Sequence, residues 1–168
     1  EIIQRPDPQD AENLLIVARK ASKSPKPIAF DRSEVEAAED LMAAYAATRA
    51  RNLAALTAVA ADIAQMAPRH VAMWGAGRIF DSLVVHGGFD PASLSLLIDT
   101  HLKALVGERY GRALAAPEEI ADAKPGVIVV MSRGFAAEIA AHAQRLAPRA
   151  EILMYGDLLA RARLRRAA

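Results

Sequence analysis

Residues 70–77 read His-Val-Ala-Met-Trp-Gly-Ala-Gly, and this stretch decides the fold. A short apolar run ends in three small residues, and an apolar-rich helical segment follows from Arg78 to His86. A strand, a glycine turn and a helix start, in this order, form the first unit of a nucleotide-binding α/β sheet. Such a turn leaves backbone N–H groups open to an anion. The stretch therefore predicts an anion-binding site without fixing a reaction.

Apolar runs and helical segments alternate from residue 71 onward. Strands are predicted at 71–74, 94–98, 127–131 and 152–154, and helices at 78–86, 117–122 and 135–146. The strands are continuous apolar runs, as expected when helices cover both faces of a parallel sheet. The predicted fold class is therefore α/β, with a Rossmann-like parallel sheet over residues 68–168.

The preceding residues predict three further segments. Residues 1–4 and 13–20 read as two strands joined by a polar turn, and such a pair cannot bury its own faces. We therefore expect residues 1–21 to be the last strands of an upstream domain, in a chain that is part of a longer protein. Without that domain, residues 1–20 are expected to be mobile, re-paired or swapped. Residues 22–32 are rich in proline, serine and lysine and predict a linker.

A long helix is predicted over residues 33–67. Ser33 and Glu36 form a capping box at its start, and Pro68 ends it. Its length of about 50 Å exceeds the width of a small domain, so it either breaks near Thr48 and Arg49 or bridges to another part of the protein. Its apolar residues fall on one side, and an alanine-rich face would permit close helix packing (Ala43, Ala44, Ala46, Ala47, Ala54, Ala55).

Composition excludes several classes of function. A net charge of +1 gives no reason to expect nucleic acid as a partner. Cysteine is absent, which excludes disulfides and thiolate metal sites and suits a cytoplasmic location. No apolar run approaches the roughly 18 residues of a membrane span, and the four histidines lack metal-ligand spacing. We expect no metal and no membrane partner, and we interpret the arginine-rich segment 160–166 as a solvated helix end.

Two later strand ends carry polar residues suited to a ligand. Asp99 stands where dinucleotide-binding proteins hold a ribose hydroxyl, although an aspartate there also caps the next turn. Lys103 either pairs with Asp99, meets a phosphate or is a solvated surface residue. Ser132 is suited to cap the following helix, and Arg133 to hold a phosphate. The crossover rule places their loop beside Gly75, where the strand order reverses.

One residue argues against a nicotinamide dinucleotide. The full fingerprint has a third small residue three positions after the second glycine, and this chain has Phe80 there. A phenyl ring holds the helix further from the strand, which weakens the NAD(P) interpretation in particular. Three interpretations remain open: contact with an anion or nucleotide, contact with NAD(P), and a glycine turn without a ligand.

The arrangement also resembles a known family. Residues 13–20 look like the last strand of a class I S-adenosylmethionine-dependent methyltransferase domain. The remainder resembles the C-terminal domain of sugar C-methyltransferases, which act on nucleotide-linked deoxysugars. The motifs that carry the likeness are Trp74-Gly75-Ala76-Gly77, Asp99 with Lys103 and Gly107, Pro117-Glu118-Glu119, and the strand over 127–131 before the helix over 135–146. They span most of residues 30–157.

The resemblance implies an accessory, substrate-binding domain of a methyltransferase. The family has an asparagine soon after the strand-end aspartate, whereas this chain has Thr100 and His101. Its S-adenosylmethionine site and catalytic base lie upstream, so no catalytic residue is predicted here and this chain alone is expected to be inactive. The predicted contacts with a substrate or nucleotide are Gly75, Ala76, Gly77, Arg78, Asp99, Lys103, Ser132 and Arg133. A homo-oligomer formed through the long helix, or another helix-mediated interaction, is the further alternative.

Overall fold

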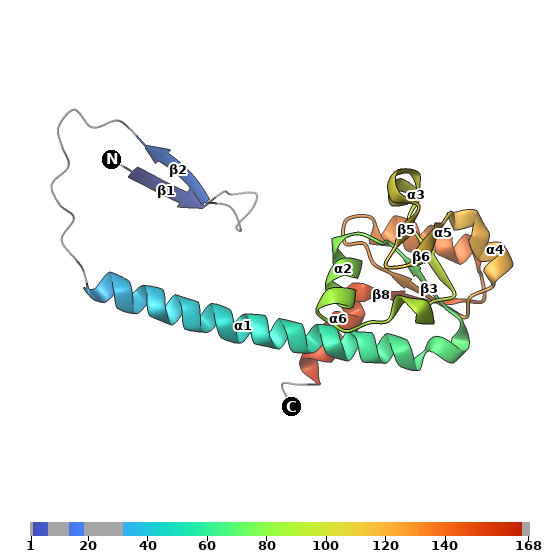
Figure 1. Ribbon diagram of the computed structural model, residues 1–168, viewed down its shortest axis with the longest axis horizontal. Coiled ribbons are helices and arrows are strands. Elements are labelled where there is room, and N and C mark those ends of the chain that lie inside the picture. Colours follow the sequence, from blue (N-terminus) through green and yellow to red (C-terminus); the bar gives the residue numbers. More distant parts are fainter. Residues whose placement is uncertain (1, 7–13, 19–31, 166–168) are drawn as a thin grey trace. The chain divides into compact units, whose positions relative to one another are not determined.

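The computed structural model describes residues 2–6, 14–18 and 32–165, with side chains from residue 32 onward (Figure 1). Contacts divide the chain into two units, Glu1–Met42 and Ala43–Ala168. We call the second unit the sheet domain. The predicted linker over residues 22–32 lies outside the described residues except for its last position, which begins a helix.

A β-hairpin is described in the first unit. Strand β1 (Ile2–Pro6) runs antiparallel to β2 (Leu14–Ala18), with Ile2 opposite Ala18 and Pro6 opposite Leu14. The two predicted strands are thus confirmed, although β1 extends beyond residue 4 to Pro6 and β2 is shorter than residues 13–20. Their connection, residues 7–13, lies outside the described residues. That this pair belongs to an upstream domain, and that it is mobile or swapped without it, stays a prediction.

Helix α1 (Arg32–Gln65) is continuous, which excludes the first of the two alternatives, a break near Thr48 and Arg49. It begins one residue before Ser33, and a short 3₁₀ turn, η1 (Ala67–Arg69), follows it. Its apolar stripe is divided. The second half packs into the core of the sheet domain through Ala55, Val59, Ala60 and Ile63, whereas Leu41, Met42 and Tyr45 are exposed. Ala55 is therefore not available on the alanine-rich face that the sequence predicted.

The sheet domain contains a six-stranded, mostly parallel sheet. Its strands are β3 (Val71–Trp74), β4 (Leu96–Ile98), β5 (Glu108–Arg109), β6 (Arg112–Ala115), β7 (Val127–Val130) and β8 (Glu151–Met154). Their order is β5-β6-β4-β3-β7-β8, and only the β5–β6 pair is antiparallel. The predicted α/β class with a Rossmann-like parallel sheet is confirmed.

Helices connect these strands. They are α2 (Arg78–Val85), α3 (Thr100–Val106), α4 (Ile120–Ala123), α5 (Ala136–Leu146) and α6 (Tyr155–Leu164), with 3₁₀ turns η2 (Pro91–Ser93) and η3 (Pro117–Glu119). The sequence predicted α2, η3 with α4, and α5 to within about two residues, which is the usual uncertainty of helix ends. It did not predict α3, β5, β6 or the full extent of α6.

Alternation along the central strand places helices on both faces of the sheet. Val71 and Met73 belong to a core cluster with residues of α1, α2 and α6, whereas Ala72 and Trp74 belong to a second cluster with residues of α4 and α5. All four residues of β3 and of β7 are buried, as expected for strands covered on both sides. The sheet is therefore the middle layer of three.

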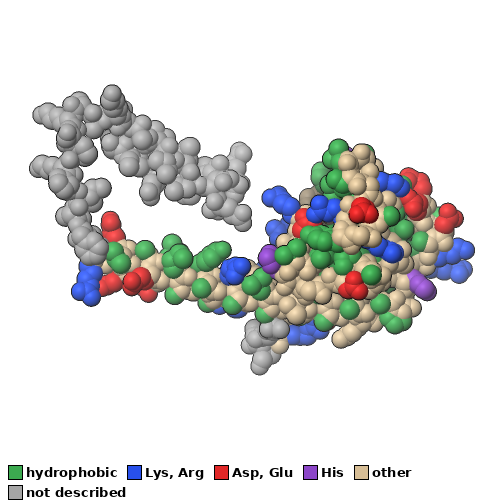
Figure 2. All heavy atoms as spheres, in the orientation of Figure 1, with side chains coloured by type: hydrophobic (Ala, Val, Ile, Leu, Met, Phe, Trp, Pro, Cys, Tyr) green, Lys and Arg blue, Asp and Glu red, His purple; other side chains and the backbone are tan. Residues whose placement is uncertain are grey.

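Some hydrophobic side chains stay on the surface of the sheet domain. They gather over α3, where Leu105 is 78% exposed and Val106 is 50% exposed (Figure 2). Helix α3 has no fully buried residue, and Leu102 is its half-buried contact with the core of the sheet domain. Among the helices of the described residues, none has the length and apolar character needed to cross a membrane.

Candidate anion-binding site

The loops after β3 and β7 lie side by side at the point where the strand order reverses. Strand β3 lies between β4 and β7 and is parallel to both, so the carboxyl ends of all three meet at one edge of the sheet. The Met131 N–H donates to the Trp74 carbonyl at 2.8 Å. The predicted adjacency of the two loops is thus confirmed, and ligands of open α/β sheets bind at such a point.

The structure requires glycine at one position of the turn and not at the other. Gly75 has a φ of +116°, and a Cβ there would lie 3.1 Å from the Cβ of Met131, so the fold itself requires glycine. Gly77 has ordinary backbone angles, and a Cβ there would meet no atom within 4 Å. The fold alone does not demand glycine at residue 77, and its missing side chain leaves the space before α2 open.

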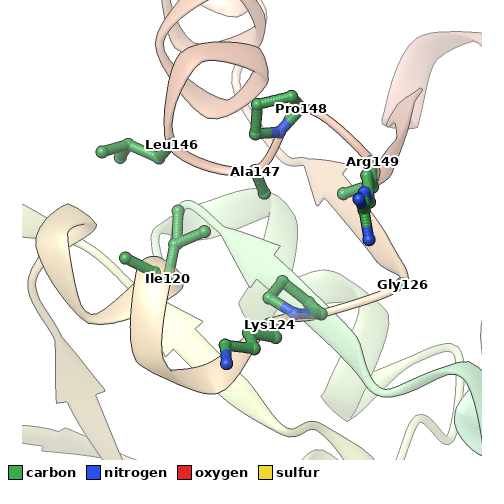
Figure 3. A pocket seen from close by; sticks show the side chains of 10 residues that line it. Ile120, Lys124, Gly126, Leu146, Ala147, Pro148 and Arg149 are labelled. Carbon is green, nitrogen blue, oxygen red and sulfur yellow. The ribbon is translucent and has the colours of Figure 1, made fainter.

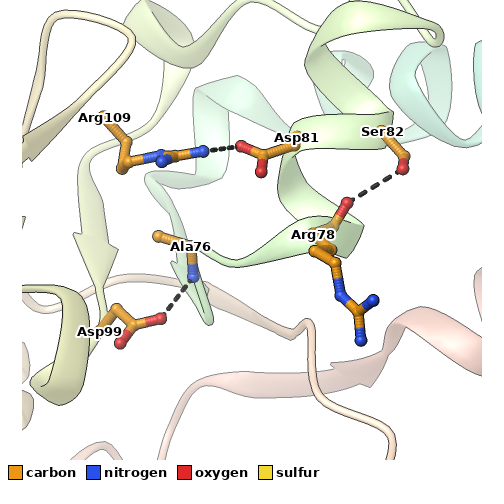
Figure 4. A network of polar contacts seen from close by, with 6 residues as sticks. All are labelled: Ala76, Arg78, Asp81, Ser82, Asp99 and Arg109. Carbon is orange, nitrogen blue, oxygen red and sulfur yellow. Dashed lines mark hydrogen bonds and ion pairs between the residues drawn. The ribbon is translucent and has the colours of Figure 1, made fainter.

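Helix α2 begins without a side-chain cap. Its cap residue is Gly77, so no side chain accepts a hydrogen bond from the first turn, where the N–H groups lack intrahelical partners and carry partial positive charge. Asp81 is the acid of this turn, but its carboxylate forms an ion pair with Arg109 (Figure 4). The start of α2 therefore presents unsatisfied donors without a compensating carboxylate.

Asp99 is bound by the protein itself. Its Oδ2 accepts from the Ala76 N–H at 2.9 Å (Figure 4), and its Oδ1 accepts from the Leu102 N–H at 3.0 Å, which caps α3. The Gly75 N–H donates to the Ile98 carbonyl at 2.8 Å. The N–H groups of Gly75 and Ala76 are thus already engaged. This geometry favours the capping interpretation of Asp99 over a ribose contact.

Two arginines stand free at this edge. Arg78 and Arg133 are exposed, and neither has an ion-pair partner among residues 32–165. Arg78 points away from the Asp81–Arg109 pair in Figure 4. Burial raises the pKa of Tyr155, the residue after β8, while the charges of Arg133 and Arg163 oppose this rise. Arg133 therefore extends positive potential toward the end of β8.

Ser132 shapes the loop that carries Arg133. Its Oγ accepts from the Phe135 N–H at 3.1 Å, three residues ahead. This bond closes the turn before α5, which begins at Ala136 with Phe135 as its cap residue and without a side-chain cap, so the predicted capping of the helix by Ser132 is wrong. The hydroxyl is therefore engaged in turning the chain toward α5.

Lys103 does not approach Asp99. Its Nζ lies 2.7 Å from Oε1 of Glu119, and the same oxygen accepts from the Ala116 N–H at 2.7 Å. This pair ties α3 to η3. Of the eight predicted contact residues, Lys103 is therefore the one that is neutralised by an ion pair, and the phosphate role considered for it loses its support.

This ion pair predicts a pH-dependent stability. The hydrogen bond from Lys103 and that from the Ala116 amide hold the pKa of Glu119 below its ordinary value of 4.5. A lowered folded-state pKa means that the stabilisation is present above pH 4.5 and is lost as the pH falls below it. Because both side chains are nearly half exposed, Glu119→Gln should cost less than about 1 kcal/mol at pH 7. Urea denaturation should show a smaller difference at pH 3.

The neighbouring Glu118→Gln is the matched control, since Glu118 is exposed and has no ion pair among residues 32–165. It should change stability little at either pH. If Glu119→Gln lowered the free energy of unfolding by the same amount at pH 3 and pH 7, the charge of Glu119 would not be the source of the stabilisation.

Sequence reasoning missed a polar cluster above α2. The β5–β6 turn places Arg109 on Asp81, with the Arg109 guanidinium 5.4 Å from the centre of the Tyr110 ring. The Tyr110 ring meets Phe80 edge-on at 5.9 Å. Burial and the nearby Asp81 carboxylate raise the pKa of Tyr110. The available signal was the pair Tyr110-Gly111 between short strands, but a hairpin turn with asparagine or aspartate before the glycine is the usual pattern.

No group of three or more potential metal-binding side chains gathers among the described residues. His86 and His101 are exposed, and His142 contacts the Trp74 ring, with 5.3 Å between ring centres.

Comparisons with protein-family models, with curated protein sequences and with solved structures find no match to this chain. The geometry of the candidate anion-binding site and the motifs of the sequence are therefore the observations that bear on function.

Proposed function

We propose that this chain is the C-terminal accessory domain of an S-adenosylmethionine-dependent methyltransferase and binds a nucleotide-linked sugar. The observation that carries the binding site is the uncapped start of α2, opened by Gly77 at the reversal of strand order. A diphosphate there would accept hydrogen bonds from the first turn of α2, as anions do at helix N-termini. Arg78 and Arg133 would supply the compensating charge.

The methyltransferase assignment draws on the motifs quoted above. S-Adenosylmethionine and the catalytic base would belong to the upstream domain, and this chain would contribute one wall of the substrate cleft. Its own residues bind and orient the substrate and transfer nothing. We therefore expect methylation from the longer protein and none from this chain alone.

NAD(P) is the weaker alternative ligand. Asp99, the residue suited to a ribose, already accepts from two backbone amides. Phe80 is fully buried where the dinucleotide fingerprint has a small residue. Both observations favour contact with a diphosphate alone over the full set of contacts made with a dinucleotide.

A helix-mediated interaction module is a second candidate, favoured by one observation. On α1, Leu41 is 70% exposed, Met42 is 65% exposed and Tyr45 is 61% exposed. Exposed apolar side chains at helical spacing suit a partner helix, which includes a second copy of this chain. A light-scattering mass equal to that of one chain would exclude self-association through α1.

Thermal unfolding with dTDP, UDP, GDP, NAD, NADP or S-adenosylmethionine tests the proposed ligand class. A ligand that binds only the folded state stabilises it by about 2.7 kcal/mol at a hundredfold excess over Kd. Stabilisation by a nucleoside diphosphate alone is expected. Stabilisation by NAD(P) would favour the alternative ligand, and no stabilisation by any nucleotide would remove the proposed site.

Arg78→Gln should weaken binding of the stabilising nucleoside diphosphate about tenfold, since one charge-assisted contact is lost. Isothermal titration calorimetry measures the change. Arg145→Gln is the matched control, because Arg145 is exposed and lies at the far end of α5, away from the carboxyl edge of the sheet. Equal affinities for the wild type and Arg78→Gln would contradict the placement of the phosphate.

A further inference from the structure

A pocket lies at the opposite edge of the sheet. A cavity of about 440 Å³ lies between the end of α4, the end of α5 and the turns that lead into β7 and β8 (Figure 3). Gly126 directly precedes β7 and Ala150 directly precedes β8, so the cavity opens at the amino ends of these parallel strands. It is therefore separate from the candidate anion-binding site at the carboxyl ends.

The cavity has an apolar interior. Ile120 is fully buried at its base and Ala150 is 7% exposed, while Leu146 and Ala147 are half-buried beside them. Figure 3 shows Ile120 and Ala147 facing each other across the space. This volume and lining fall within the range of pockets that hold small organic molecules.

Two cations border this apolar space. Lys124 and Arg149 line the cavity, and both are exposed. Neither has an ion-pair partner among residues 32–165. The nearby carboxylate of Glu151 is committed to Arg69, with 2.7 Å between Oε2 and Nη1. The border of the cavity therefore carries net positive charge.

Lys124 has a backbone conformation that does not suit a lysine. It caps the end of α4 with a φ of +45° and a ψ of +54°, the left-handed region in which helices normally end with glycine or asparagine. Pro125 follows it, and the residue before a proline favours an extended conformation. Residues other than glycine in such an unfavourable backbone conformation cluster at functional sites. Glycine would fit the backbone at residue 124 better than lysine does. The backbone conformation therefore does not explain the lysine, and its side chain is a candidate for a functional role.

We propose that this cavity binds a small organic carboxylate with an apolar body. Figure 3 shows the two cationic groups on different sides of the cavity, so their exposed side chains would turn toward a carboxylate at the border and donate charge-assisted hydrogen bonds to it. The apolar body would pack against Ile120, Ala147 and Ala150. The site is independent of the nucleotide site proposed at the carboxyl edge, so either can fail without the other.

Titration with 3-phenylpropanoate, followed by ¹H–¹⁵N NMR of the whole chain, tests this site. We expect saturable shifts of the Gly126, Ala147 and Ala150 amides. The uncharged 3-phenylpropanamide should bind at least tenfold more weakly, because it lacks the carboxylate. Shifts confined to residues 75–78, no shifts at all, or equal binding of acid and amide would overturn the proposal.

Lys124→Gly separates the function of the side chain from that of the backbone. The variant should bind 3-phenylpropanoate about tenfold more weakly and unfold at a higher temperature, because glycine adopts the left-handed conformation freely. Arg149→Gln tests the second cation without a change of backbone and should also bind about tenfold more weakly. Arg78→Gln, at the other edge, should bind as the wild type does. Unchanged affinity in both Lys124→Gly and Arg149→Gln would overturn the assignment.

Discussion

Replacement of Phe80 by alanine should lower the free energy of unfolding of the sheet domain by about 3–5 kcal/mol. The ring is 0% exposed and belongs to the core cluster that includes Met73 and Leu97 of the sheet. Its removal exchanges a large buried apolar surface for a cavity, which the packed strands around it cannot close. It also removes the edge-on contact that supports Tyr110. Urea denaturation measures the loss.

Phe135→Ala is the matched control for this prediction. The same atoms are removed from a ring that is 66% exposed at the start of α5, so stability should change by less than about 0.5 kcal/mol. If Phe80→Ala fails to fold, Phe80→Leu keeps most of the buried volume and should cost about 1 kcal/mol. Equal losses from Phe80→Ala and Phe135→Ala would show that the Phe80 ring is not a core residue.

The central part of the fold could be predicted because its signals are local and strong. Val71–Trp74 and Val127–Val130 are continuous apolar runs that end in turn residues, and both are strands buried on every side. The helix that begins at Arg78 follows a glycine turn, a combination with few structural alternatives. The crossover rule alone predicted that the loops after β3 and β7 lie side by side.

The segment from α3 to β6 could not be predicted in the same way. Helix α3 has only seven residues and none of them is fully buried, so its short apolar pattern is too brief to identify a helix. Strands β5 and β6 are joined by Tyr110 and Gly111, which have φ values of +50° and +72°. A tyrosine seldom adopts that conformation, so the Tyr110-Gly111 pair is only a weak signal of a turn. These elements depend on tertiary contacts: Asp99 caps α3, and β6 pairs with β4 and buries Leu114 and Ala115.

The candidate site was only partly predictable for a related reason. Gly77, Arg78 and Arg133 could be placed at one edge from the order of strands. The sequence could not distinguish a free polar group from one already bound, because that depends on tertiary contacts. Lys103 had several possible partners, and Glu119 became the partner through the fold. Asp99 likewise had two possible roles, and its hydrogen bonds favour the structural one.

Asp99→Ala should lower the free energy of unfolding by about 2–4 kcal/mol. The substitution leaves two backbone donors without a partner, the Ala76 N–H in the glycine turn and the Leu102 N–H at the start of α3. Loss of a helix cap costs about 1 kcal/mol, and a partly buried amide without an acceptor costs about 1–3 kcal/mol. Because α3 has no fully buried residue, its amides should also exchange faster with solvent once the cap is lost.

Asp99→Asn separates the two contacts of this side chain. Its remaining carbonyl oxygen can still cap α3, while its amide group cannot accept from the Ala76 N–H. We therefore expect a loss of about 1–2 kcal/mol, with the faster hydrogen exchange confined to the glycine turn. Asp90→Ala removes another aspartate cap, on the short turn η2, where only the Ala92 N–H loses its acceptor. It should cost about 1 kcal/mol. If Asp99→Ala cost no more than Asp90→Ala, the link between Asp99 and the glycine turn would not stabilise the site, and Asp99 would again be available for a ligand.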